Sequence, residues 1–271
     1  MYYINPAFAL FTFVIFGFNA CQPKTASETR NDFKKYYDSF QVDGSFVLYN
    51  PQDEKYIFYN PKQFEQVFIP ASTFKICNSL IGLETGVIPN ENFVIPWDST
   101  QHQNPSWNAD HDLTTAFKNS TVWYYRELAR RVGPSQMNFW LHKANYGNAD
   151  TTGGIDKFWL TGGLRITPKQ QIDFLQRLHD GKLPFSKRSM DIVKNIMIMK
   201  KTPVYTLRAK TGWAWQGGKD IGWYIGYLET KNKVYYFANC IQSTDSLNAS
   251  FSIARTEIAD RILKDLKLIE E

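Results

Sequence analysis

The strongest constraint on this chain is a serine and a lysine, Ser72 and Lys75, set three positions apart at the start of an apolar segment. Residues with this spacing lie on the same side of a helix. Residues 76–83 are largely apolar around the whole helix, so we expect this helix to be buried in a core. Burial lowers the pKa of a lysine, because the ammonium group loses its water. The pattern therefore predicts a neutral amine beside a serine hydroxyl, which is an arrangement suited to acyl transfer.

Two further short motifs follow along the chain. Lys210-Thr211-Gly212 is the only Lys-Thr-Gly present, and it closes an alternating run over residues 204–209 that predicts a strand. Glycine at such a place lets a ligand approach the backbone closely. Ser120-Thr121-Val122 lies between the other two motifs, directly after an apolar helical stretch. Each motif alone is common, so the information is in their order.

The ordered set Ser-x-x-Lys, Ser-x-Val and Lys-Thr-Gly resembles the serine β-lactamase and penicillin-binding protein superfamily. The resemblance is strongest to the class D (oxacillinase-type) β-lactamases and spans about residues 30–271. Four further features support it: Tyr146-Gly147-Asn148, Phe158-Trp159-Leu160, Trp107 and Arg255.

The resemblance implies a role for each matching residue. Ser72 is expected to be the nucleophile that opens the β-lactam ring, with the backbone N–H groups of Ser72 and Trp213 as the oxyanion hole. Lys75 is expected to carry a carbamate formed from carbon dioxide, with no other cofactor and no metal. Ser120 is expected to pass a proton to the leaving nitrogen, and Lys210 to keep the site positive. The carbamate would lie against Val122, Trp159 and Leu160, and the substrate against Thr211, Gly212, Trp213, Arg255 and Trp107.

Strand patterns at both ends of the chain flank a helical middle, which predicts an α+β protein. Strands are expected at residues 44–49, 56–59, 203–210, 221–228 and 233–241. Helices are expected at residues 113–117, 123–132, 134–144, 168–180 and 190–199, followed by a final amphipathic helix near residues 258–266. Hairpin signals join the C-terminal strands, so the sheet should be antiparallel. The resemblance implies a β-lactamase/transpeptidase-like fold, with helices flanking the sheet and a helical lobe inserted at about residues 62–200.

The N-terminus is predicted to direct export. Residues 1–20 carry no charged side chain, and residues 8–18 form a short apolar run typical of a secretion signal. Residues 18–21, Phe-Asn-Ala-Cys, resemble a lipoprotein cleavage box, so both lipidation of Cys21 with membrane attachment and plain secretion stay open. Either outcome places the protein outside the bacterial cytoplasm, in the periplasm. Residues 21–31 are interpreted as a polar tether and residues 32–271 as one domain.

Composition argues against several other classes. The net charge of +5 is scattered without a basic run, which disfavours nucleic acid as a partner. The four histidines have no ligand spacing among themselves or with cysteine, which disfavours a metal site. Cys77 falls in the buried helix and Cys240 in an expected strand, so we expect two buried free thiols rather than a disulfide.

Besides a hydrolase of small-molecule β-lactams, three other classes of protein are compatible with these motifs. A penicillin sensor domain and a cell-wall transpeptidase both usually have asparagine where this chain has Val122, which favours hydrolysis. An extracytoplasmic binding lipoprotein that keeps the fold without the chemistry stays open. Covalent labelling by penicillin that is lost in a folded Ser72→Ala variant would discriminate the enzyme from that binding protein.

Overall fold

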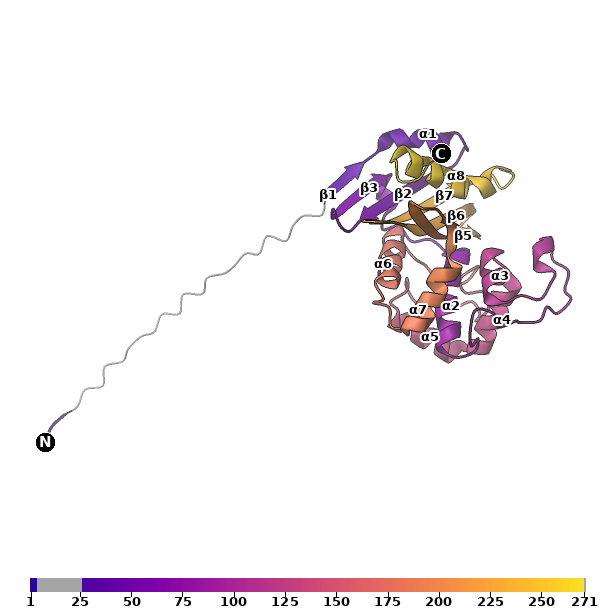
Figure 1. Cartoon of the computed structure of the whole chain (residues 1–271), viewed down its shortest axis with the longest axis horizontal. Coiled ribbons are helices and arrows are strands. Elements are labelled where there is room, and N and C mark those ends of the chain that lie inside the picture. The colour runs from indigo at the N-terminus through magenta and orange to yellow at the C-terminus, as the bar shows by residue number, and fades with distance from the viewer. Residues whose placement is uncertain (4–25, 271) are drawn as a thin grey trace.

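The computed structural model describes residues 1–3 and 26–270. Residues 26–270 form a mixed sheet flanked by helices on both faces. Figure 1 shows the short helix α1 (Lys34–Asp38) and the C-terminal helix α8 (Phe251–Asp265) over one face, with a larger helical lobe under the other. The predicted α+β fold, with a helical insert between two sets of strands, is confirmed.

The sheet has seven strands in the described part of the chain, in the order β1-β3-β2-β7-β6-β5-β4. Their bounds are β1 Ala26–Thr29, β2 Asp43–Asn50, β3 Lys55–Tyr59, β4 Ile198–Lys201, β5 Tyr205–Gln216, β6 Lys219–Thr230 and β7 Val234–Ser243. Gly217 and Gly218 form the tight β5–β6 turn, with φ values of 59° and 81° that glycine adopts without the strain a Cβ would cause.

Every neighbouring pair of strands is antiparallel except β1 and β3, which run parallel. β2 pairs with β7, so the N-terminal strands extend the sheet formed by the C-terminal hairpins. This pairing places the first and last thirds of the chain in one layer, and the helical lobe is inserted between them (Figure 1).

The helical lobe is built from six α-helices. Their bounds are α2 Lys75–Glu84, α3 Leu113–Lys118, α4 Val122–Val132, α5 Pro134–Lys143, α6 Pro168–His179 and α7 Lys187–Ile196. The predicted start of α6 is confirmed in detail: the Thr167 side chain accepts a hydrogen bond from the backbone N–H of Gln170, whose own side chain accepts one from the Thr167 N–H. This capping box satisfies two backbone donors that lack partners inside the helix.

The two faces of the sheet bury separate hydrophobic clusters. The larger cluster lies between the sheet and the helical lobe and includes Phe74, Trp159 and Trp223. The smaller one lies under α1 and α8 and includes Phe46 and Phe237. Because both faces are covered, β6 is buried at nearly every position instead of alternating.

Three predicted element boundaries differ from the structure. The helix expected at residues 190–199 is α7, which begins at Lys187 and ends at Ile196, and the apolar residues after it form β4. Pairing with the edge of β5 decides this boundary, and the local pattern contains no information about that partner. The Lys-Thr-Gly motif lies in the middle of β5 rather than at its end. Part of the expected tether, Ala26–Thr29, is strand β1 beside β3.

The export signal and Cys21 lie outside the described residues. Within residues 1–3 and 26–270, no helix is both long and apolar enough to cross a membrane. Cys77 and Cys240 are both buried and unpaired, as predicted.

Candidate active site

Ser72, the expected nucleophile, lies in a tight turn between the sheet and the helical lobe. Ala71, the residue before it, has a φ of 50°, a left-handed conformation that is unfavourable for a residue with a Cβ. Two hydrogen bonds hold the turn: the Ala71 N–H donates to the Trp159 carbonyl (3.0 Å), and the Thr73 hydroxyl donates to the Pro70 carbonyl (2.7 Å). A Cβ at Gly212 would lie 3.0 Å from the Pro70 carbonyl oxygen, so glycine allows β5 to pack against the turn.

Ser72 and Lys75 lie side by side, although not on one regular helix as predicted. Ser72 is in a 3₁₀ turn, Ala71–Phe74, and Lys75 is the first residue of α2. Lys75 Nζ lies 2.6 Å from Ser72 Oγ, and the lysine side chain is fully buried. Burial, and to a smaller degree the charge of Lys210, hold the Lys75 pKa well below its usual value. The amine is therefore suited to act as a base toward the serine.

A second hydroxyl and lysine face this pair from other elements. Lys210, on β5, donates a hydrogen bond of 2.9 Å from Nζ to Ser120 Oγ, in the turn between α3 and α4. Burial, together with the charge of Arg255, lowers the pKa of Lys210 to about 7. The motifs found 90 residues apart in the sequence thus meet in space.

The residues expected around Lys75 are buried to different degrees. Trp159 is fully buried, and its indole Nε1 has no hydrogen-bond acceptor among the described residues. Val122 and Leu160 are half-buried. The ring of Tyr125 lies 5.3 Å below Lys75 Nζ, and the Tyr125 hydroxyl is 2.9 Å from Ser79 Oγ. Sequence reasoning missed Tyr125, and its only signal was a position one helical turn after Val122.

Arg255 reaches the site from α8 across strand β6. Its Nη1 donates a 3.2 Å hydrogen bond to the Gly212 carbonyl, and its guanidinium lies 5.3 Å from the Trp213 ring centroid. Gly222, opposite Trp213 in the β5–β6 register, makes room for this path, because a Cβ there would come within 2.8 Å of Arg255 Cγ. Burial lowers the Arg255 pKa to about 10. Sequence reasoning missed Gly222.

The remaining aromatic residues lie at the margin of the site. Trp213 is 45% exposed, and its indole N–H donates to Asp220 (2.7 Å), while Trp215 is 52% exposed. The Trp107 indole instead donates to the backbone carbonyl of Asn119, at 3.0 Å. Trp107 is half-buried.

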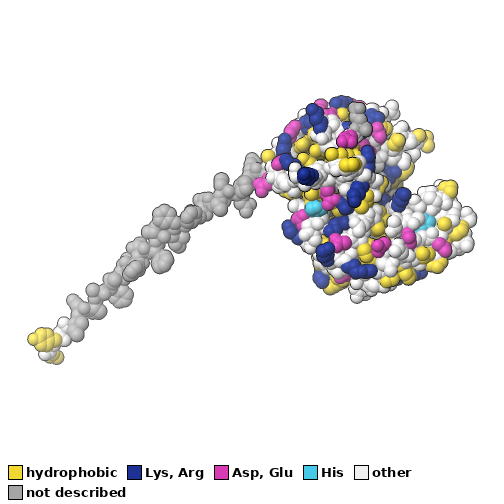
Figure 2. All heavy atoms as spheres, viewed as in Figure 1, with side chains coloured by type: hydrophobic (Ala, Val, Ile, Leu, Met, Phe, Trp, Pro, Cys, Tyr) yellow, Lys and Arg dark blue, Asp and Glu magenta, His cyan; other side chains and the backbone are white. Residues whose placement is uncertain are grey.

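A cavity of about 260 Å³ opens beside Lys210 and Thr211, between α3 and the start of β4. Figure 2 shows the two lobes separated by a notch on one side of the molecule. Among the described residues, no group of three or more His, Cys, Asp or Glu side chains is placed to hold a metal ion.

Comparison with known proteins identifies the family. The sequence model of the penicillin binding protein transpeptidase domain matches residues 31–264. The chain is 38% identical over 249 residues to β-lactamase OXA-48 of Klebsiella pneumoniae, a match that covers 91% of this chain and 93% of that protein. It is similar to the crystal structure of a class D β-lactamase from Nostoc, with 46% identity, a TM-score of 0.83 and coverage of 88% and 99%. The chain belongs to the class D β-lactamase family.

The family's fold is shared by a domain of a penicillin receptor. The C-terminal domain of the Bacillus licheniformis BlaR penicillin receptor is similar at 34% identity and a TM-score of 0.85, covering 92% of this chain and all of that domain. The fold alone is therefore compatible with a receptor as well as with an enzyme, and the roles of individual residues depend on the geometry of the site.

Proposed function

We propose that this protein hydrolyses β-lactam antibiotics, penicillins among them, through an acyl-enzyme on Ser72. The observation that carries the proposal is the contact between Ser72 Oγ and the fully buried Lys75 Nζ, with the pKa of Lys75 well below its usual value. A serine needs an adjacent base to attack a carbonyl at neutral pH, and this amine is in reach.

We propose further that Lys75 works as a carbamate. The neutral amine attacks carbon dioxide, a nitrogen–carbon bond forms, and the amine's proton leaves to solvent. A buried anion persists only when it is hydrogen-bonded. The unpartnered indole N–H of Trp159 is a donor suited to that anion, and Val122 and Leu160 would exclude water from it.

Acylation would then begin when the carbamate takes the proton of Ser72 Oγ. The oxygen attacks the ring carbonyl, and the backbone N–H groups of Ser72 and Trp213 stabilise the oxyanion. The carbon–nitrogen bond breaks as Ser120 Oγ gives its proton to the ring nitrogen, and Lys210, 2.9 Å away, supports that transfer. The proton taken from Ser72 would then pass through Lys210 to Ser120, which restores both the carbamate and the Ser120 hydroxyl. In deacylation the carbamate takes a proton from water, the water oxygen attacks the ester carbonyl, and the carbamate returns the proton to Ser72 Oγ as the ester carbon–oxygen bond breaks.

The substrate's carboxylate would be held by positive charge and hydrogen bonds. Thr211 is half-buried on β5, and Gly212, Trp213 and Arg255 lie beside it. Arg255 and Lys210 have no carboxylate partner within 4.0 Å among the described residues, so a substrate anion would be their counter-ion. Trp107 and Trp213 would contribute apolar walls.

The protein would act on a small molecule outside the cytoplasm. Curated relatives include β-lactamases such as OXA-10 of Pseudomonas aeruginosa, with 38% identity over 84% of this chain. We propose export to the periplasm, either as a free protein or attached to the membrane through Cys21. Palmitate labelling of the wild type and of Cys21→Ser would distinguish the two.

The second candidate is a penicillin sensor, favoured by the likeness to the BlaR receptor domain. Such a protein is acylated but not deacylated. Val122 beside the proposed carbamate favours the hydrolase, because an apolar side chain there would protect the anion from water.

Penicillin turnover in degassed buffer, then with added bicarbonate, tests both candidates. Turnover that rises with bicarbonate supports a hydrolase with a carboxylated Lys75. One equivalent of stable acyl-enzyme in either buffer supports the sensor. A folded Ser72→Ala variant should form no covalent adduct, and an adduct on that variant would contradict the nucleophile assignment.

A further inference from the structure

Ser120 occupies a backbone position that normally belongs to glycine. At the end of α3 the Thr121 N–H donates to the Ala116 carbonyl (2.9 Å) and the Ser120 N–H donates to the Phe117 carbonyl (3.2 Å). This pair of bonds is the Schellman motif, in which the residue at the position of Ser120 is left-handed. Its φ is 55°, which costs a residue with a Cβ about 1–2 kcal/mol. Surrounding contacts must therefore hold Ser120 in place.

Two tryptophans bracket the turn. The Trp107 indole N–H donates to the carbonyl of Asn119, the residue immediately before Ser120, at 3.0 Å. The indole N–H of Trp123, which follows the Ser120-Thr121-Val122 motif, donates to the Trp107 carbonyl at 2.8 Å. Carbonyls at a helix end lack helical partners, so the Trp107 bond satisfies one that orients the peptide leading into Ser120.

The segment that carries Trp107 is itself braced. The Asn104 side chain accepts a bond from the Ser106 N–H (3.1 Å) at the start of the 3₁₀ turn Pro105–Trp107. Asn108 and His102 exchange two bonds: the His102 N–H donates to Asn108 Oδ1 (2.8 Å), and Asn108 Nδ2 donates to the His102 carbonyl (3.1 Å). These hydrogen bonds hold the loop that carries the Trp107 indole in one conformation.

We propose that Trp107 is a positioning residue for Ser120, acting through the Asn119 carbonyl in addition to any contact with substrate. The inference rests on the proposed function, in which Ser120 Oγ protonates the ring nitrogen as the carbon–nitrogen bond breaks. Ser120 Oγ is held 2.9 Å from Lys210 Nζ, and a rotation of the preceding peptide would turn it away. Trp107 therefore links the loop at residues 102–108 to the position of the proton donor Ser120.

Trp107→Phe tests the proposal, because phenylalanine keeps an aromatic ring and removes the indole N–H. The acylation rate constant with a penicillin should fall about 10-fold, the effect of one lost hydrogen bond of roughly 1.4 kcal/mol. Deacylation should not change, since its base is on Lys75. A thioester substrate, whose thiolate leaves without a proton, should be acylated at the wild-type rate.

Trp97→Phe is the matched control. Its indole also donates to a carbonyl of the same loop, that of Thr100 at 2.9 Å, but this carbonyl is not next to Ser120. It should acylate like the wild type. Unchanged penicillin acylation in Trp107→Phe, or an equal loss with the thioester, would overturn the proposal.

A double-mutant cycle separates positioning from direct substrate contact. In a Ser120→Ala background, Trp107→Phe should cause no further loss of acylation, and an undiminished loss would overturn the inference. If Trp107→Phe melts below the assay temperature, Trp123→Phe replaces it, with a smaller loss expected in the same direction and no loss as the contrary result. A wild type that is acylated without turnover would refute hydrolysis and leave this test intact, whereas a wild type that is never acylated would refute both.

Discussion

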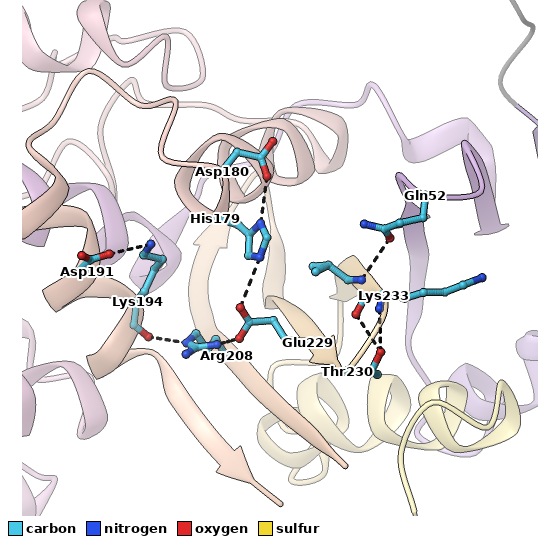
Figure 3. A network of polar contacts seen from close by, with 10 residues as sticks. Gln52, His179, Asp180, Asp191, Lys194, Arg208, Glu229, Thr230 and Lys233 are labelled. Atoms are coloured by element: carbon cyan, nitrogen blue, oxygen red, sulfur yellow. Dashed lines mark hydrogen bonds and ion pairs between the residues drawn. The ribbon is translucent and has the colours of Figure 1, made fainter. Parts of the chain in front are cut away.

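Arg208 and Lys210 lie two residues apart on the same face of β5, yet only the charge of Arg208 is compensated by a carboxylate among the described residues. Arg208 belongs to a paired network: it forms an ion pair with Glu229, and its Nε donates to the Lys194 carbonyl at 2.9 Å. Figure 3 shows His179 between Asp180 and Glu229 in the same network, which joins α6 and α7 to the sheet. Lys210 forms no ion pair with any described residue.

Lys210 is part of a cationic cleft, which we define as Lys75, Lys210 and Arg255. Burial lowers the pKa of all three, and none has a carboxylate partner among the described residues. Buried charge without a partner destabilises a fold, so such groups are typical of functional sites. In the network of Arg208, Glu229 and His179 the side chains are partly exposed and each charge has a partner of opposite sign, as expected of a structural contact. A structural ion-pair network and the proposed active site thus use neighbouring residues of the same strand, β5.

Lys75→Met should produce the largest separation of activity from stability. The methionine matches the lysine's length and removes the base, so acylation should fall by about 10⁴-fold. The free energy of unfolding should rise, because no amine is desolvated on folding. Stopped-flow acylation and urea unfolding measure the two effects, with exposed Lys62→Met as the control. A lower free energy of unfolding in Lys75→Met would contradict the view that the buried amine of Lys75 destabilises the fold.

Lys210 should make the stability of the protein depend on pH. Its pKa falls from 10.5 to about 7 on folding, so between those pH values the unfolded state binds more protons. The stability of the wild type should therefore rise with pH across this window relative to Lys210→Met, by a few kcal/mol. Urea unfolding at pH 7 and at pH 10 measures it. A difference independent of pH would mean that Lys210 keeps its charge in the fold.

Val122→Asn should slow deacylation about 10-fold, and more than acylation, because an amide next to the proposed carbamate admits water. Separate acylation and deacylation rate constants measure the effect, and Val122→Ile should behave like the wild type. Unchanged turnover in Val122→Asn would exclude the protective role given to Val122.

Glu229→Gln should have the smallest effect. Removing the partner of Arg208 and His179 should lower the free energy of unfolding by about 1 kcal/mol, since the pair is partly exposed. The value of kcat/KM should stay within about twofold of the wild type, because the network does not touch the cleft. A tenfold loss of activity would show that the two regions are coupled through β5.

Local sequence patterns predicted much of the fold and the centre of the site. The contact of Ser72 with Lys75 follows from a spacing of three residues, and the α6 capping box from Thr167 and Gln170. The β5–β6 hairpin follows from its paired glycines. These predictions succeeded because the deciding atoms lie within one or two turns of backbone.

The remaining features depended on partners far away in the sequence. β4 is a strand because the edge of β5 is there to pair with it, and Arg255 reaches Gly212 because Gly222 leaves its path open. The order of the three motifs in the sequence was enough to indicate the family and the proposed chemistry, because each motif supplies side chains of the candidate active site. Only the tertiary structure decided that Trp107 bonds the peptide before Ser120, because that contact depends on loop geometry and packing that no local pattern encodes.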